Sequence, residues 1–213
     1  MAFDMDGLLV DSEPLWFLAE SAVMARLGGA WGPPDQHALI GGSLRSAVEY
    51  LLAKATRPAE PAVVGRWLIE TMVDLVSTRP LTVLPGAGDL VHEVQAVGLP
   101  HALVTSSEPA VVDAVLARLD VRFDVVVCAA DVTRTKPDPE GYLLAAAKLG
   151  VDPRRCIALE DSANGVAAAE AAGYRVVAVP SVVPVPGRPG RLVLGTLAGV
   201  TLAELRARTG LAA

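Results

Sequence analysis

From residue 81 onward, short apolar runs alternate with longer segments in which apolar residues recur at helical spacing. Continuous apolar runs are typical of strands buried on both faces, and strand–helix alternation is typical of parallel sheets covered by helices. The expected strands are residues 101–105, 123–128, 156–159 and 175–179, and the expected helices are residues 109–119, 139–149 and 165–172. This part of the chain therefore predicts an α/β fold with a doubly wound parallel sheet.

Residues 14–80 have a different pattern, because only helical spacing occurs there. Helices are expected at residues 15–27, 44–55 and 62–76, separated by Gly and Pro clusters such as Gly32-Pro33-Pro34. Phe3 lies at the end of one more short apolar stretch, which places a strand of the sheet before this helical segment. The pattern predicts a core of residues 1–13 and 81–213 with an insert at residues 14–80.

Composition and charge exclude several classes of protein. The chain has 213 residues, of which 52% are hydrophobic, and a net charge of −6 without any run of Lys or Arg. This argues against a nucleic-acid partner. No apolar run approaches the ~18 residues of a membrane span, and the N-terminus does not resemble a signal peptide. Cys128 and Cys156 lie in apolar runs and are expected to be buried thiols, which favours a reducing compartment. We expect a cytoplasmic protein, monomeric by default.

Polar residues follow the expected strands at the edge of the sheet where ligands bind in open parallel sheets. They comprise Asp4 to Gly7, Thr105 to Ser107, residues 129–136 ending in Lys136, and the pair Glu160-Asp161. Because the carboxyl ends of parallel strands meet at one edge, we expect these side chains to form one site.

The two acid pairs allow more than one interpretation when each is taken alone. Asp4-Met5-Asp6-Gly7 is compatible with an ordinary acidic turn, but its Gly comes too early for an EF-hand calcium loop. Glu160-Asp161 is compatible with a solvated acidic pair. Carboxylates crowded at one sheet edge raise one another's pKa unless a cation intervenes, and Mg²⁺ suits a few carboxylates together with phosphate oxygens. The acid pairs together therefore favour a magnesium site.

The remaining strand ends supply hydroxyls and a positive charge. Thr105 and Ser106 are compatible with a capping role, and Lys136, between Thr135 and Pro137, with a surface position. Together with the acid pairs, however, they make up what phosphoryl transfer requires, namely a nucleophile, a metal site and charge to stabilise phosphate oxygens.

Four segments of the chain resemble, in order, the four motifs of the haloacid dehalogenase superfamily of phosphatases. They are residues 3–13 (FDMDGLLVDSE), Thr105, Lys136-Pro137, and residues 159–162 (LEDS) with Gly165. The resemblance implies a Rossmann-like core, and the helical insert directly after the first motif is similar to the helical-cap subfamily. That subfamily includes phosphosugar phosphatases and β-phosphoglucomutase. Residues 14–80 would then be a cap domain that closes over the site.

The resemblance also implies residue roles. Asp4 would be the nucleophile that forms an aspartyl-phosphate, and Asp6 the general acid and base. Mg²⁺ would be held by Asp4, the Asp6 carbonyl, Asp161 and, directly or through water, Glu160. Phosphate would be bound by Thr105, Ser106 and Lys136, and the substrate-contact candidates on the cap are Ser43 and Arg45.

Two departures from β-phosphoglucomutase favour hydrolysis. That enzyme has a His where this chain has Trp16, and its cap loop has an Arg where this chain has Leu44. We therefore predict a magnesium-dependent phosphatase acting on a small phosphorylated metabolite, with a phosphosugar mutase as the alternative. Phosphosugars, 2-phosphoglycolate and nucleotides all remain open as substrates. A non-catalytic phospho-acceptor module is disfavoured, because receiver domains are about half this length and lack a cap.

Overall fold

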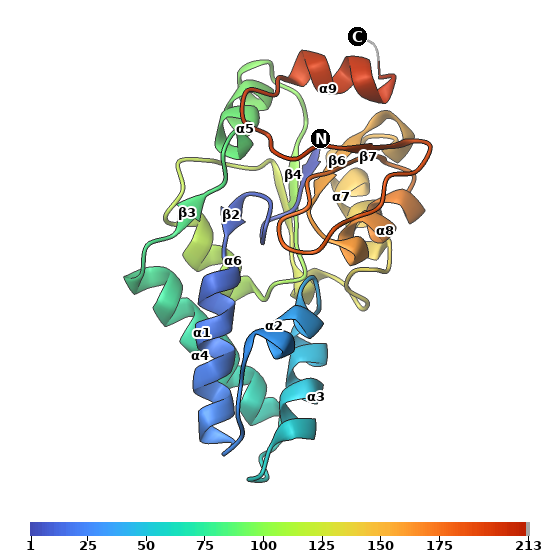
Figure 1. Cartoon of the computed structure of the whole chain (residues 1–213). Helices are drawn as coiled ribbons and strands as arrows, with labels where there is room; N and C mark the ends of the chain where they lie inside the picture. Colours follow the sequence, from blue (N-terminus) through green and yellow to red (C-terminus); the bar gives the residue numbers. More distant parts are fainter. Residues whose placement is uncertain (212–213) are drawn as a thin grey trace.

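The computed structural model describes residues 1–211 and contains a six-stranded sheet in the order β5-β4-β1-β6-β7-β8, in which all neighbouring strands are parallel (Figure 1). The strands are β1 (Ala2–Phe3), β4 (Ala102–Val104), β5 (Val125–Val127), β6 (Ile157–Glu160), β7 (Arg175–Ala178) and β8 (Arg191–Val193). The short β1 is central, because it pairs with β4 on one side and with β6 on the other. The chain order reverses beside β1, which is where open α/β sheets bind ligands.

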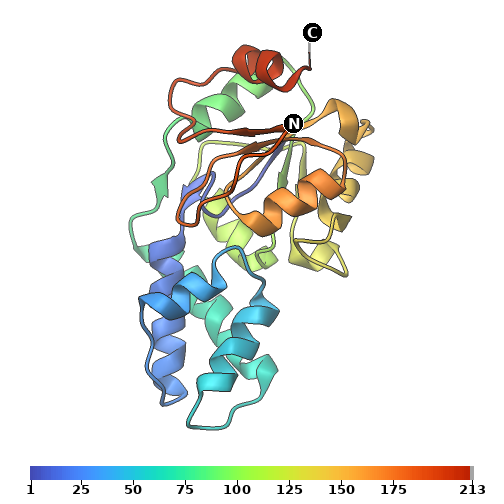
Figure 2. The same ribbon diagram turned by 45° about the vertical axis from the view of Figure 1, so that its right-hand side comes forward.

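Each strand divides its residues between the two faces of the sheet, as the two-residue period of a strand requires. Phe3, Leu103, Leu159 and Val177 belong to one hydrophobic cluster, and the residue before each of them belongs to the other. The first cluster includes side chains of α5 (Ala87–Ala96), α6 (Pro109–Leu116) and α9 (Leu202–Thr209), and the second those of α7 (Glu140–Leu149) and α8 (Ala163–Ala171). Helices thus cover both faces (Figure 2), which confirms the predicted doubly wound α/β core.

Four helices lie together at one end of the molecule (Figure 1). They are α1 (Glu13–Arg26), α2 (Pro33–Leu39), α3 (Leu44–Lys54) and α4 (Pro61–Thr78), and they share a separate hydrophobic cluster that includes Val23, Leu51 and Leu68. The chain leaves the core through β2 (Val10–Asp11) and returns through β3 (Thr82–Val83), and these strands pair antiparallel. The predicted helical cap is therefore present, while its division from the core at residues 14 and 80 stays a prediction.

Some elements differ from the sequence-based expectation. Gly32-Pro33-Pro34 was expected to break the helical pattern, but α2 begins at Pro33, because proline at the first helical positions loses no intrahelical hydrogen bond. No element was expected at α5, β8 or α9 or at the β2–β3 ribbon, although each is part of the folded core. Two 3₁₀ turns, at Ala129–Asp131 and Pro153–Arg155, complete the regular structure of residues 1–211.

Both cysteines are buried and free, as the apolar runs around them predict. Within residues 1–211, none of the helices is both long and apolar enough to cross a bilayer.

Candidate active site

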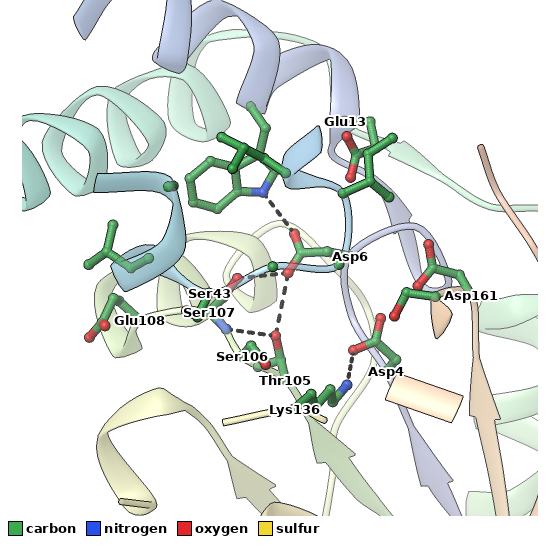
Figure 3. A pocket seen from close by; sticks show the side chains of 18 of the residues that line it. Asp4, Asp6, Glu13, Ser43, Thr105, Ser106, Ser107, Glu108, Lys136 and Asp161 are labelled. Carbon is green, nitrogen blue, oxygen red and sulfur yellow. Dashed lines mark hydrogen bonds and ion pairs between the residues drawn. The ribbon is translucent and has the colours of Figure 1, made fainter. Parts of the chain in front are cut away.

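The carboxyl ends of β1, β4 and β6 open into a pocket that α1–α4 cover from the other side (Figure 3). Residues at the strand ends and residues of α1–α4 and their loops line the pocket together. The strand ends contribute Asp4, Asp6, Thr105, Ser106, Lys136 and Asp161, and the helical part contributes Glu13, Trp16, Glu20, Gln36, Ser43, Leu44 and Ile69. The four strand-end segments singled out in the sequence therefore meet at one site.

Lys136 joins two buried carboxylates beneath the pocket. Its Nζ lies 2.5 Å from Asp4 Oδ1 and 2.5 Å from Glu160 Oε1, and it donates to the Val104 carbonyl at 2.8 Å. An ammonium group has three hydrogens, so these partners use all of them. The Tyr142 ring lies against the ammonium group, and its hydroxyl donates to Glu160 Oε1 at 2.6 Å. The Glu160 carboxylate is fully buried. Lys136 is therefore a buried cation rather than a surface lysine.

Asp161 approaches Asp4 from the end of β6. Ser181, which follows β7, donates to Asp161 Oδ2 at 2.6 Å. Gly7 passes so close that a Cβ atom there would lie 2.1 Å from Asp161 Oδ2, and its φ of 78° is one that L side chains rarely adopt. Only glycine therefore fits this turn, and the turn brings Asp4 and Asp6 to the same pocket.

The electrostatics of this cluster are unbalanced. Burial, and then the neighbouring Glu160, raises the pKa of Asp4 well above its ordinary value, and the same two causes raise the pKa of Asp161 to about 7. Burial alone would lower the pKa of Lys136, but Asp4 and Glu160 outweigh it and raise that pKa. Full ionisation of the three carboxylates would give three negative charges against the one positive charge of Lys136, and two negative charges would then be uncompensated, which is why these pKa values rise when no metal is bound.

This donor set fits a divalent cation. One oxygen from each of Asp4, Glu160 and Asp161 lies within 4.8 Å of the others, and all three residues are buried. Hard oxygen ligands of this kind suit Mg²⁺ or Ca²⁺, and a charge of +2 would balance the cluster. The carboxylate of Asp6 is not part of this group, which is compatible with the backbone role suggested for Asp6 by the family resemblance.

Asp6 instead accepts hydrogen bonds from four residues of the described part of the chain, of which Ser107 and Thr105 are labelled in Figure 3. Its Oδ1 accepts from Ser12 Oγ at 2.6 Å and from Trp16 Nε1 at 3.3 Å. Its Oδ2 accepts from Ser107 Oγ at 2.7 Å and from Thr105 Oγ1 at 3.4 Å. These contacts fix the orientation of a carboxyl group that lies in the pocket beside Asp4.

Thr105 and Ser106 lie at the end of β4, where their hydroxyls face the pocket. The Ser107 backbone N–H donates to Thr105 Oγ1 at 3.0 Å, and the buried Ser106 Oγ has no hydrogen-bond partner among residues 1–211. A buried hydroxyl without a partner is suited to form a hydrogen bond with a bound ligand.

The cap candidates are placed differently from one another. Ser43 lines the pocket, and its hydroxyl also caps α3 by accepting from the Ser46 N–H at 3.2 Å. Arg45 is exposed and is not among the residues that line this pocket. The loop before Ser43 touches the core, because Asn164 Nδ2 donates to the Gly41 carbonyl at 2.9 Å.

Several polar residues of the site were given no role from the sequence. Ser12 lies inside the first motif and Ser107 in the strand-end segment after β4, so both positions were indicated but their contacts with Asp6 were not. Glu13, Trp16 and Glu20 are spaced three and four residues apart, which puts them on one helix face. Tyr142 and Ser181 gave no signal, because only the tertiary packing brings them to the carboxylates.

The chain matches the family model of haloacid dehalogenase-like hydrolases over residues 1–173. It is 39% identical over 214 residues to hexitol phosphatase B of Escherichia coli (strain K12), covering 97% of this chain and 93% of that protein. It is 32% identical over 183 residues to fructose-1-phosphate phosphatase YqaB of the same organism, covering 84% of this chain and 95% of the relative.

Solved structures agree with these similarities. The crystal structure of CbbY from Rhodobacter sphaeroides in complex with phosphate superposes with a TM-score of 0.86 at 29% identity, covering 96% of this chain and 97% of CbbY. A β-phosphoglucomutase from Clostridium difficile has a TM-score of 0.82 at 23% identity, covering 98% of this chain and 96% of that one, a likeness of fold alone. The chain therefore belongs to the haloacid dehalogenase-like hydrolases and is a phosphoric monoester hydrolase.

Proposed function

We propose that this enzyme hydrolyses a small phosphomonoester of the phosphosugar type, with Mg²⁺ as cofactor, through an aspartyl-phosphate on Asp4. The observation that carries the proposal is the position of Asp4. Its carboxylate is buried at the end of the central strand, is paired with Lys136, and faces a pocket lined by hydroxyls and by Asp6. The alternatives of an acidic turn and a surface lysine do not account for this arrangement.

In the first step, an oxygen of the Asp4 carboxylate attacks phosphorus, and the bond between phosphorus and the ester oxygen breaks. The protonated Asp6 carboxyl gives its proton to the departing alkoxide, so that an alcohol leaves. Thr105, the Ser106 backbone and Lys136 stabilise the phosphoryl oxygens. Because its three hydrogens are already used, Lys136 acts through its charge or exchanges one partner for a phosphate oxygen.

In the second step, the Asp6 carboxylate takes a proton from water as the water oxygen attacks phosphorus. The bond between phosphorus and Asp4 breaks, inorganic phosphate forms, and Asp6 returns to its protonated state. The donors around Asp6, from Ser12, Trp16, Ser107 and Thr105, keep this carboxyl in place through both steps.

Mg²⁺ would be held by Asp4, Asp161, the Asp6 carbonyl and, directly or through water, Glu160, where it supplies charge that stabilises the transferring phosphoryl group. Removal of divalent metal with EDTA should abolish phosphate release, and readdition of Mg²⁺ should restore it. Because Mg²⁺ binds only the folded protein, it should also raise the Tm by about 5–10 °C at a hundredfold excess over its Kd. A Tm that does not respond to Mg²⁺, or hydrolysis that survives EDTA, contradicts the assignment.

The relatives favour sugar and polyol phosphates as substrates, since one is a hexitol phosphatase and another a fructose-1-phosphate phosphatase. CbbY has been solved with xylulose-(1,5)bisphosphate. A panel that also holds 2-phosphoglycolate and nucleotides, assayed for inorganic phosphate, tests this proposal. A coupled assay with β-glucose 1-phosphate separates it from the mutase alternative, because a mutase yields an isomer and not free phosphate.

We further propose that residues 14–80 act as a cap whose loop closes the pocket through the Asn164–Gly41 hydrogen bond. Asn164→Ala removes this contact between cap and core, which is worth about 1 kcal/mol. The variant should have a KM about three- to tenfold higher for the best substrate of the panel, with a smaller change in kcat and an almost unchanged Tm.

Gln95→Ala is a matched control. Gln95 also donates from a side-chain amide to a backbone carbonyl, that of Arg122 at 2.7 Å, but it does not line the pocket. It should leave KM unchanged. An unchanged KM in Asn164→Ala as well would refute the proposed closing contact.

A further inference from the structure

A buried carboxyl group lies in the wall of the pocket and is unpaired in the described part of the chain. It belongs to Glu20, in α1, which is only 4% exposed and whose Oε2 is enclosed there without a hydrogen-bond partner. Among the hydrogen bonds and ion pairs of residues 1–211, none involves its carboxyl group, although Glu20 lines the pocket. Buried polar groups are normally hydrogen-bonded, so an unpaired one beside a pocket indicates that a ligand supplies the partner.

The position of Glu20 along α1 shows which part of a ligand it would meet. Glu13, Trp16 and Glu20 follow one another at intervals of three and four residues, so they share a face of α1, and all three line the pocket. Trp16 contacts Asp6 at the reacting end. Glu20 lies four residues further, roughly 6 Å along the helix axis. It therefore faces the organic part of a substrate and not the phosphoryl group.

The described residues that line the pocket around Glu20 do not supply a positive charge to its carboxyl group. Lys136 is the only cation among the described residues that line the pocket, and its hydrogens are used at the opposite end. The wall contributed by α3 and α4 is apolar, with Leu44, Ala47 and Ile69. Burial, and then the charge of Glu13, raises the pKa of Glu20 to about 8. A neutral carboxyl group both donates and accepts a hydrogen bond, as does a hydroxyl group.

We propose that Glu20 is a specificity-determining residue that binds a hydroxyl group on the organic part of the substrate, at a distance from the phosphoryl group. The enzyme therefore selects phosphoesters of polyhydroxy chains, that is, of sugars or polyols, over phosphoesters of plain alkyl chains. This inference rests on the proposed phosphatase function and deepens it. The apolar wall packs against the carbon chain, and the Glu20 carboxyl fixes its orientation.

The test compares two substrates of similar length, a hexitol 6-phosphate and n-hexyl phosphate, which lacks hydroxyls. We expect the ratio of their kcat/KM values to fall at least about 30-fold in Glu20→Leu, mainly through KM for the hexitol phosphate, because a site built for a hydroxyl group discriminates strongly. Glu20→Gln keeps a hydrogen-bond donor and an acceptor, so the ratio of kcat/KM values should fall less than about fivefold in this variant. Glu49→Leu, at an exposed position of α3, is the control and should leave the ratio unchanged.

A ratio that stays within about twofold of the wild-type value in Glu20→Leu overturns the inference, as does an equal loss for both substrates, which would indicate a structural role. A second measurement does not depend on turnover. In the Asp4→Asn background, adding Glu20→Leu should weaken binding of the hexitol phosphate at least about tenfold relative to inorganic phosphate. Failure of the wild-type enzyme to release phosphate from any panel member would instead overturn the proposed function and leave this binding comparison to decide the role of Glu20.

Discussion

Asp4→Asn should lower kcat for the best phosphoester substrate by about 10⁴-fold or more, because an amide cannot replace a carboxylate as the nucleophile. The folded state should tolerate the change. The introduced asparagine has nearly the same shape as Asp4, and its neutral amide removes one of the three crowded carboxylates. Steady-state kinetics and thermal unfolding of the same preparation test both expectations, which separates a loss of chemistry from a loss of fold.

The covalent step can be followed directly. Acid quenching during turnover of a ³²P-labelled substrate should trap label on the wild-type protein, and hydroxylamine should release it as expected for an acyl phosphate. Asp4→Asn should trap no label, whereas Asp113→Asn, at an exposed position of α6, should behave like the wild type. If Asp4→Asn still carries hydroxylamine-sensitive label, the nucleophile is another carboxylate.

Lys136→Met should be the most destabilising single change at the site, by about 3–5 kcal/mol in the absence of divalent metal. The substitution removes the ammonium group that pairs with Asp4 and Glu160 and leaves their charges buried without compensation. Activity should also be lost, since the same charge stabilises the phosphoryl oxygens. Urea denaturation in EDTA, followed by circular dichroism, gives the free energy of unfolding.

The pH dependence of the free energy of unfolding gives a second check that the destabilisation by Lys136→Met is electrostatic. The folded-state pKa of Asp161 is raised from 3.8 to about 7 by burial and then by Glu160, so between these values the folded protein binds more protons than the unfolded chain. Stability in EDTA therefore falls as pH rises through this window. Removing Lys136 leaves ionised carboxylates buried without a cation, and protonation at lower pH removes their charge. The loss in free energy of unfolding caused by Lys136→Met should therefore be smaller at pH 5 than at pH 8.

Lys148→Met serves as the matched control. Lys148 also forms an ion pair, with Asp131 at 3.3 Å, but its side chain is 42% exposed. Exposed pairs contribute little, so this variant should lose less than about 1 kcal/mol at any pH in the range. Equal losses for the two lysine variants would mean that burial of the Lys136 cluster has no special energetic role.

The parallel core was predictable because its signal is local. A strand buried on both faces needs a continuous apolar run, and residues 101–105, 123–128, 156–159 and 175–179 contain β4, β5, β6 and β7, apart from Glu160 at the end of β6. The helices α1, α3, α4, α6, α7 and α8 follow from apolar residues at helical spacing. β2 and β3, of two residues each, were missed because no separate apolar run marks them, and β8 was missed because it directly follows the Pro- and Gly-rich residues 180–190.

The sequence by itself indicated which polar residues gather at the strand ends. These residues directly follow or lie near a recognisable strand or motif, and they are Asp4, Asp6, Thr105, Lys136 and Asp161. The topological rule for parallel sheets then brought them to one edge without any coordinates. It could not distinguish a surface Lys136 from a buried one, because burial depends on elements far apart along the chain.

Only the tertiary structure decided which partners these side chains have and which of them are buried. It places Lys136 between Asp4 and Glu160, turns the Asp6 carboxylate toward Ser12, Trp16, Ser107 and Thr105, and leaves Arg45 exposed outside the pocket. It also encloses Glu20, on a cap helix, where its Oε2 has no hydrogen-bond partner within residues 1–211. Each outcome depends on contacts between side chains of distant segments, and such contacts arise only when the sheet and the cap pack together.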